Sequence, residues 1–364
     1  MNENKPTLVI ENGVKKFRSH GYNYNFTISN GYFERWGATK EEDPDYSPFG
    51  FEIADIEISA SSSTGGGCPV SCPMCYKGNN SKPGIPDNMS LEIFKTILSK
   101  FPKIDGLYFA CQIAFGITAV GSSPEIFDIF QHCRDNNIVP NLTINGSDPL
   151  SDEHIDKLIS LVGAMAISVV SPREENGYNL IQKIISRGGK QINIHYVIHD
   201  KSINKAYNVC NVIKNDERLA GLNAIVFLGL KPKNRGQSFD VLPTTEYVKL
   251  VEYCIENKIR FGFDSCSSPK TELAITNSTK ITDELKENIL NCCERCESYL
   301  FSWYCNADGI SYPCSFGEDK EESIDMIKVN DFMGDMWNSE KAVNWRKRLF
   351  SLERECPIYP EIRI

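Results

Sequence analysis

Three cysteines on one short segment are the residues of this chain whose type and spacing most directly suggest chemistry. Cys68, Cys72 and Cys75 follow the pattern C-x3-C-x2-C. Three thiolates on one loop can ligate three different irons of a 4Fe–4S cubane, which leaves the fourth iron without a protein ligand. An iron with an open position can bind a small molecule. We therefore expect Cys68, Cys72 and Cys75 to hold such a cluster.

The alternatives for these cysteines are a structural zinc site and disulfide bonds. A structural zinc ion normally takes four protein ligands, and this segment offers three. Disulfides are typical of secreted proteins, whereas the first residues, Met1 to Pro6, are polar and no apolar signal segment follows them. The spacing favours an iron–sulfur cluster over zinc, and the clustering favours metal binding over disulfides.

The cysteine segment follows the first of several short apolar segments that alternate with amphipathic ones. This alternation predicts a parallel sheet with right-handed helical crossovers. About six such units suit a partial (β/α)6 barrel, whose active site would lie at the carboxyl ends of the strands. The expected strands are 53–59, 106–115, 139–144, 164–170, 191–198, 222–228 and 260–263. The expected helices are 91–101, 124–136, 152–162, 179–187, 203–214 and 245–257, with N-caps at Ser90 and Ser151.

Two further regions flank this alternating part, so we expect an α/β chain of three regions. Residues 1–50 form a small β region, because Asn12-Gly13 and Asn30-Gly31 separate short alternating runs and are typical of hairpin turns. Residues 51–265 form the barrel. Residues 266–364 lose the alternation and are rich in cysteine, with a hairpin expected around Asn306–Gly309 and a helix around residues 339–351.

The cysteine spacing, its place after the first strand and the alternation over about residues 51–265 resemble the radical S-adenosylmethionine (SAM) superfamily. The resemblance implies that the amino and carboxylate groups of SAM bind the open iron. It implies that an electron from the cluster cleaves SAM to methionine and a 5′-deoxyadenosyl radical, which abstracts a hydrogen atom from a substrate. Met74 stands where the family commonly has an aromatic residue, and it can still pack on adenine.

The resemblance also implies SAM contacts at the ends of three further strands. Members often carry Gly-Gly-Glu after the second strand, where this chain has Gly116 and Thr118 without the acid, so Thr118 or a backbone carbonyl would take its place. Asn145 belongs to a turn that is similar to the family's Thr-Asn-Gly turn. Ser168 matches a position that often binds the SAM carboxylate or ribose, although a strand hydroxyl with a purely structural role is equally compatible.

The cysteines after residue 265 resemble the auxiliary-cluster extensions of the SPASM and twitch types. The spacings depart from the full seven-cysteine pattern, so we expect one auxiliary 4Fe–4S cluster. Its expected ligands are Cys266, Cys296, Cys314 and Cys356, with Cys293 as the main substitute. Structural zinc or free thiols are the alternatives. Four other cysteines lie in strand-like or helix-like segments and are expected to be core residues: Cys111, Cys133, Cys210 and Cys254.

Two histidines and two basic residues near the predicted strand ends admit two interpretations each. His195 and His199 either contact substrate or are packed and hydrogen-bonded, and the second is favoured. Lys231 and Arg235 either bind a carboxylate or phosphate or lie in a solvated loop.

Composition limits the classes of partner that the chain is expected to have. A formal net charge of −9 argues against a nucleic-acid partner, and the sequence contains no apolar run long enough to cross a membrane. We expect a cytoplasmic protein that uses an electron donor such as flavodoxin or ferredoxin.

The expected function is that of a radical SAM enzyme acting on a side chain of a peptide or protein. A radical SAM enzyme that acts on a small metabolite or nucleotide is the first alternative, and a non-catalytic iron–sulfur or zinc protein is the second. The sequence leaves open whether the reaction class is oxidoreductase or transferase.

Overall fold

The computed structural model describes residues 5–59, 68, 70–78, 88–318 and 320–364. The Gly65–Gly67 run before the first cysteine lies outside the described residues. None of the described helices is long and apolar enough to cross a membrane.

A ten-stranded sheet organises most of the chain, with the strand order β13-β12-β11-β10-β9-β8-β5-β14-β15-β16. The strands from β13 to β14 are parallel to their neighbours, and β15 and β16 are antiparallel. The expected α/β fold with a large parallel sheet is confirmed. The strand bounds are β5 Ile53–Glu57, β8 Gln112–Gly116, β9 Val139–Asn145, β10 Met165–Ser168, β11 Ile192–Ile198, β12 Ala224–Gly229, β13 Phe261–Phe263, β14 Ser302–Cys305, β15 Ile310–Tyr312 and β16 Ile324–Asp325.

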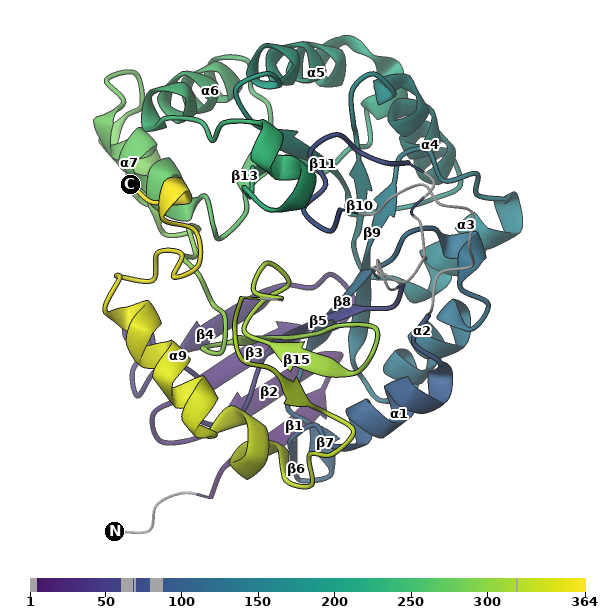
Figure 1. The fold of residues 1–364 in the computed structure, drawn as a ribbon, viewed down its shortest axis with the longest axis vertical. Helices are drawn as coiled ribbons and strands as arrows, with labels where there is room; N and C mark the ends of the chain where they lie inside the picture. Colours follow the sequence, from purple (N-terminus) through teal and green to yellow (C-terminus); the bar gives the residue numbers. More distant parts are fainter. Residues whose placement is uncertain (1–4, 60–67, 69, 79–87, 319) are drawn as a thin grey trace.

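Helices lie on the outer side of the parallel strands, and the strands line the inner side of a curved arrangement (Figure 1). The helices are α1 Leu91–Ser99, α2 Ile126–Asp135, α3 Asp152–Leu161, α4 Glu174–Ser186, α5 Ile203–Asn215, α6 Thr244–Glu256, α7 Ser268–Asn277, α8 Asp283–Leu290 and α9 Glu340–Phe350. Short helical turns are η1 Val120–Ser122, η2 Glu217–Leu219, η3 Asn234–Ser238, η4 Phe332–Trp337 and η5 Pro360–Ile362. Ser90 and Ser151 cap α1 and α3 as expected, because their hydroxyls accept from Ile93 N and His154 N.

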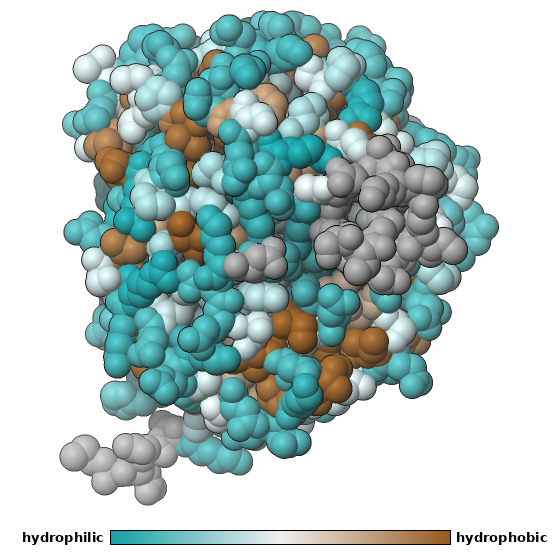
Figure 2. Space-filling view, viewed as in Figure 1, coloured by the Kyte–Doolittle hydropathy of each residue, from teal (hydrophilic) through white to brown (hydrophobic). Residues whose placement is uncertain are grey.

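The apolar core lies between the sheet and these helices. Alternate residues of each strand point to opposite faces, so Ala54 and Ile56 of β5 are buried beneath the helices while their neighbours face inward. The four cysteines expected in the core, Cys111, Cys133, Cys210 and Cys254, are all buried, which confirms that expectation. The face of the molecule in Figure 2 is mostly hydrophilic, with apolar side chains in small groups.

Residues 7–36 form a separate antiparallel sheet of four strands, β1 Thr7–Glu11, β2 Val14–Arg18, β3 Asn23–Thr27 and β4 Phe33–Trp36. Asn12 and Gly13 have φ of 53° and 74°, as a two-residue hairpin turn requires. The sheet packs on the main body through aromatic side chains. The ring centroids of Tyr24 and Phe109 are 5.3 Å apart, and the Tyr24 hydroxyl donates to Phe109 O at 2.8 Å.

Two expected elements differ in extent from the structure. The strand predicted at residues 106–115 begins only at Gln112, because the preceding residues form a two-stranded ribbon of β6 Lys103–Ile104 and β7 Leu107–Tyr108. Asp105 and Gly106 turn that ribbon with positive φ of 50° and 83°. Helix α4 begins at Glu174, five residues earlier than residue 179. The sequence pattern hid this start because Gly177 interrupts it, yet a Cβ at Gly177 would lie 2.9 Å from Val169 Cγ2.

The C-terminal part is joined to the main sheet. Strand β14 pairs in parallel with β5, with Cys305 opposite Ile56. The expected hairpin around residues 306–309 is present between β14 and β15. Strands β13 and β16 are the two ends of the sheet, and within the described residues they do not pair with each other. Closure into a partial barrel and the division at residues 50 and 265 stay predictions.

Candidate metal and cofactor site

The carboxyl ends of the parallel strands bring the expected site residues to one edge of the sheet. Ser168, the last residue of β10, lies opposite Asn145 of β9 and His195 of β11. Gly116, the last residue of β8, lies opposite Glu57 of β5. Because the cysteine segment follows β5, this edge is where a group held by that segment would meet Gly116, Asn145 and Ser168.

Cys68, Cys72 and Cys75, called here the loop cysteines, lie within electrostatic range of one another. Burial raises the pKa of the Cys72 thiol to about 11, and the charges of Cys75 and Cys68 contribute to this shift. Arg173 and Arg235 act in the opposite direction. The loop turns tightly, since Cys75 N donates to Cys72 O at 3.2 Å. Three thiols and two guanidinium groups therefore share one neighbourhood, and metal ligation would relieve the cost of burying the thiolates.

Two buried polar groups at this edge have atoms that find no partner among the described residues. Arg173 donates from Nη2 to Val70 O at 2.7 Å, but its Nε is buried and unpaired. Thr118 is 7% exposed, and its Oγ1 is likewise unpaired. Buried polar atoms normally have hydrogen-bond partners, so Arg173 Nε suits an acceptor atom of a ligand, and the Thr118 hydroxyl suits either a donor or an acceptor. Sequence reasoning named Thr118 and missed Arg173, which lies just before α4 without a recognisable motif.

The two faces of β5 differ: the inward face carries carboxylates, whereas the outward face carries core residues. Asp55 is accessible to water, yet enough protein surrounds it that burial raises its pKa to about 6. No hydrogen bond or ion pair joins the Asp55 carboxylate to another described residue. Its charge contributes to a raised pKa of Glu297, which places the two carboxyl groups near each other on the inner side of the sheet. The inner face is therefore polar and acidic at this point.

Four cysteines from separate segments gather near one another. Cys266 follows β13, Cys296 follows α8, Cys314 follows β15 and Cys356 follows α9. Burial raises the pKa of Cys266 well above its usual value, and the charges of Cys296 and Cys356 contribute. Burial also raises the pKa of Cys314 to about 12, with Cys296 and Cys356 again contributing. These four, called here the distal cysteines, are thus brought together by the fold.

The charges that act on Cys293 are not those of the distal cysteines. Burial raises the pKa of Cys293 to about 11, and the nearby charges are those of Glu272, Cys292 and Glu294. None of these belongs to the distal cysteines, although Cys293 lies only three residues before Cys296. The choice between the original set of four and Cys293 as a substitute stays a prediction.

The distal cysteines admit two kinds of metal group, a cluster or a single zinc ion. Within the described residues, no three His, Cys, Asp or Glu side chains are arranged to hold one metal ion. Zinc requires four ligands about 2.0–2.3 Å from one centre, whereas the ligands of a cubane each bind a different iron and are spread more widely.

The two histidines occupy different surroundings. Burial lowers the pKa of His195 to about 4, so this side chain on the inner face of β11 is neutral at physiological pH. His199 Nδ1 lies 3.3 Å from Asp200 Oδ1, and the ring packs 4.3 Å from that of Phe239. The packed, hydrogen-bonded interpretation is confirmed for His199.

Lys231 and Arg235 do not lie in a solvated loop. Lys231 is 5% exposed and its Nζ lies 2.7 Å from Asp264 Oδ2, so its charge is already compensated inside the protein. Arg235 donates from Nε to Cys72 O at 2.9 Å. The solvated alternative is wrong because each side chain is used to hold a neighbouring segment.

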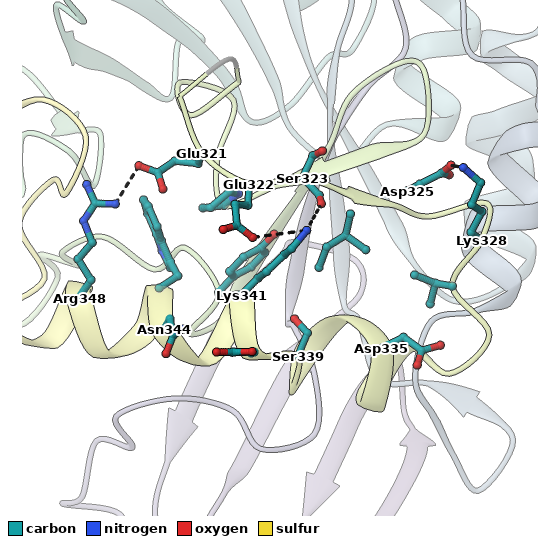
Figure 3. Close-up of a pocket in the computed structure, with 16 residues that line it drawn as sticks. Glu321, Glu322, Ser323, Asp325, Lys328, Asp335, Ser339, Lys341, Asn344 and Arg348 are labelled. Atoms are coloured by element: carbon teal, nitrogen blue, oxygen red, sulfur yellow. Dashed lines mark hydrogen bonds and ion pairs between the residues drawn. The ribbon is translucent and has the colours of Figure 1, made fainter.

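A cavity of about 760 Å³ lies between β16 and α9 (Figure 3). Its charged groups pair with one another. Arg348 Nη1 is 2.9 Å from Glu321 Oε1, and Lys328 Nζ is 2.8 Å from Asp325 Oδ2. This hollow therefore offers few uncompensated groups to a ligand.

Comparison with known proteins gives a likeness of fold. No family model matches the sequence, and no curated protein matches it. A crystal structure of SuiB from Streptococcus suis bound to S-adenosylmethionine aligns with a TM-score of 0.59 at 11% identity, covering 82% of this chain and 68% of that chain. A structure of SuiB bound to the precursor peptide SuiA aligns with a TM-score of 0.63 at 11% identity, covering 93% and 90%. The shared fold spans nearly all of this chain.

Proposed function

We propose that this chain is a radical SAM enzyme whose loop cysteines hold a 4Fe–4S cluster. The observation that supports this most directly is the position of a three-thiol loop at the carboxyl edge of a parallel sheet, in a fold shared with SuiB. A cluster with three protein ligands retains one iron for a small-molecule ligand. When bound, the cluster supplies the electron for cleavage of SAM to methionine and a 5′-deoxyadenosyl radical, which abstracts a hydrogen atom from the substrate.

The residues of this chain would bind and orient SAM. The Arg173 guanidinium, with its unpaired Nε, suits a carboxylate, and the Thr118 hydroxyl can bond the amino group in place of the missing acid. Asn145 and Ser168 stand side by side at the ends of β9 and β10, where they can contact the carboxylate or ribose. Gly116 presents backbone without a side chain at the same edge.

The distal cysteines would hold an auxiliary 4Fe–4S cluster. Their mutual electrostatic influence supports a ligand set of Cys266, Cys296, Cys314 and Cys356. A structural zinc ion is the second candidate for these cysteines, because four thiolates are also a common zinc ligand set. The partial barrel between the two groups would enclose the substrate.

A peptide or protein side chain is the proposed substrate, with a small metabolite or nucleotide as the alternative. The fold shared with SuiB, which has been crystallised with a precursor peptide, supports the first. Asp55 provides an uncompensated carboxylate on the inner face, where it can bind a hydrogen-bond donor or cation of the substrate. A flavodoxin or ferredoxin would supply the electron, and the reaction class stays open between oxidoreductase and transferase.

The test is anaerobic reconstitution of the full chain followed by reduction in the presence of SAM. We expect about eight irons per chain, as two 4Fe–4S clusters require, and formation of 5′-deoxyadenosine and methionine. A loaded protein that forms no 5′-deoxyadenosine would remove the proposed activity. Zinc analysis separates the second candidate, because a zinc site at the distal cysteines would give about four irons and one zinc per chain.

A further inference from the structure

The loop after β12 contacts both groups of cysteines. Three consecutive side chains each donate to a backbone carbonyl of a cysteine-bearing segment. Lys233 Nζ lies 2.9 Å from Glu318 O, on the segment that follows Cys314. Asn234 Nδ2 lies 2.6 Å from Tyr76 O, and Arg235 Nε lies 2.9 Å from Cys72 O. The loop therefore spans from the distal cysteines to the loop cysteines.

The backbone of this loop is shaped for these contacts. Asn234 has a positive φ of 50°, which Asn tolerates better than most residues. At Gly236, a Cβ would lie 2.2 Å from Lys231 O, so only glycine fits this turn. At Gly78, where φ is +68°, a Cβ would lie 3.1 Å from Asn234 Cβ. The loop after β12 and the segment after Cys75 thus approach each other closely at two residues that depend on unusual backbone angles.

Lys77 makes a second connection between the same two segments. Its Nζ lies 2.8 Å from Glu57 Oε2, 2.7 Å from Glu318 Oε2 and 2.9 Å from the Tyr304 hydroxyl. The lysine and the two glutamates are only 10–15% exposed. Tyr304 completes the network through its hydroxyl, which lies 2.5 Å from Glu318 Oε1. An ion network buried to this degree holds its geometry, because separating the charges would leave them desolvated and unpaired.

An aromatic contact lies beside this network. The rings of Tyr76 and Phe316 meet edge to face with centroids 4.6 Å apart. Tyr76 is the residue after Cys75, and Phe316 lies two residues after Cys314. The segment 76–78 therefore rests directly on the segment 314–318, so a displacement of one segment displaces the other.

From these contacts we propose that Lys77, Asn234 and Glu318 are positioning residues that couple the two cysteine sites, so that an occupied distal site holds the loop cysteines in the geometry that binds SAM. The inference rests on the proposed function. Its physical basis is preorganisation: a metal group on Cys314 fixes the segment 314–318, and the loop cysteines then lose less conformational entropy when SAM binds. Coupling of this kind is reciprocal, so SAM would also stabilise the distal site.

The test is a double-mutant cycle on SAM affinity in the reconstituted full-length protein. Cys314→Ala is expected to raise the Kd for SAM about tenfold when the connection is intact, within the usual range of coupling between sites. In the charge-balanced background Lys77→Met/Glu318→Gln, the same substitution is expected to change the Kd less than twofold. Asn234→Gly is the milder second background, because glycine keeps the positive φ and removes only the amide. The electron paramagnetic resonance change caused by SAM is a second readout.

Lys100→Met is the matched control. Lys100 Nζ donates to Met326 O and Ile327 O, both at 2.7 Å, so it also joins the parallel-sheet part to the C-terminal part, but through neither the segment 72–78 nor the segment 314–318. Cys314→Ala should keep its tenfold effect in this background.

Two results would overturn the coupling. One is a tenfold effect of Cys314→Ala on the Kd for SAM in the Lys77→Met/Glu318→Gln and Asn234→Gly backgrounds too. The other is no effect of Cys314→Ala on SAM affinity in the otherwise unsubstituted protein. Failure of the proposed function looks different, because the iron-loaded unsubstituted protein would then bind no SAM.

Discussion

The two groups of cysteines are assembled in opposite ways. The loop cysteines lie within eight residues of one segment, so their grouping is local and their spacing already reveals it. The distal cysteines come from four segments between residues 266 and 356, and only the fold brings them together. A local site depends on one loop. A site built from four segments depends on the packing of every element that carries a ligand, so substitutions should affect the two groups differently.

The largest effect should follow from removing one loop cysteine. Cys72→Ala leaves two ligands on the segment, too few for a site-differentiated cubane, so about four irons per chain should be lost. Formation of 5′-deoxyadenosine should fall to background, because the open iron is lost with the cluster. Iron analysis and chromatography of the products measure both. Cys133→Ala is the control, since Cys133 is a buried core residue that belongs to neither ligand set. Retained 5′-deoxyadenosine formation in Cys72→Ala would assign the chemistry elsewhere.

The next effect distinguishes Cys296 from Cys293, the two candidates for one ligand of the distal site. Cys296→Ala should lower the iron content by about four per chain, while Cys293→Ala should leave it unchanged. The reason is that the charges acting on Cys293 are Glu272, Cys292 and Glu294, whereas Cys296 acts on Cys266 and Cys314. Equal iron loss in both variants would contradict this assignment.

The difference between the two groups also explains what the sequence could predict. The βα alternation identified most strands and helices of the parallel sheet, because each element buries one face and its period is visible locally. It missed the turn at Asp105-Gly106 and the early start of α4, where a single turn or a single glycine interrupts the period. The pairing of β14 with β5 was not predictable, because nothing in the residues 302–305 specifies a parallel partner about 250 residues earlier.

The same reasoning applies to individual site residues. Gly116, Asn145 and Ser168 could be named because they end strands of a recognisable series. Arg173 could not, because its importance follows from an unpaired buried atom, which only the packing shows. Lys231 and Arg235 could be recognised as charged residues near the carboxyl ends of the strands. Their partners, Asp264 and the Cys72 carbonyl, are set by tertiary structure.

A smaller effect should follow from Arg173→Gln, which tests whether the edge beside the loop cysteines binds SAM. Loss of a charge-assisted hydrogen bond costs about 1.5–3 kcal/mol, so the Kd for SAM should rise at least about tenfold. Equilibrium binding to the reconstituted protein measures this, with iron content checked because Arg173 also contacts Val70. Arg187→Gln is the control, since Arg187 pairs with Asp152 and Asp156 on the surface. Unchanged affinity in Arg173→Gln with full iron content would remove Arg173 from the site.

The smallest effect concerns Asp55, on the inner face of β5 near Glu297. Its folded pKa of about 6 is above the ordinary value of 3.8, so ionisation costs stability as pH rises through this interval. Asp55→Asn should therefore stabilise the folded protein at pH 7.5, and the stabilisation should be smaller at pH 5.5. The shift corresponds to about 3 kcal/mol, but water reaches the side chain, so a gain of about 1 kcal/mol is expected.

Thermal unfolding of Asp55→Asn at the two pH values measures this gain, with exposed Asp45→Asn as the control. A carboxylate that destabilises the folded protein is typical of a residue kept for function, so the stabilised variant should also bind or turn over its substrate less well. Equal or lower stability of Asp55→Asn at pH 7.5 would show that Asp55 is compensated, and the inner face would then lack the uncompensated charge proposed for the substrate. The contrast with the cysteines would still hold, because their substitution acts through metal content and that of Asp55 through charge alone.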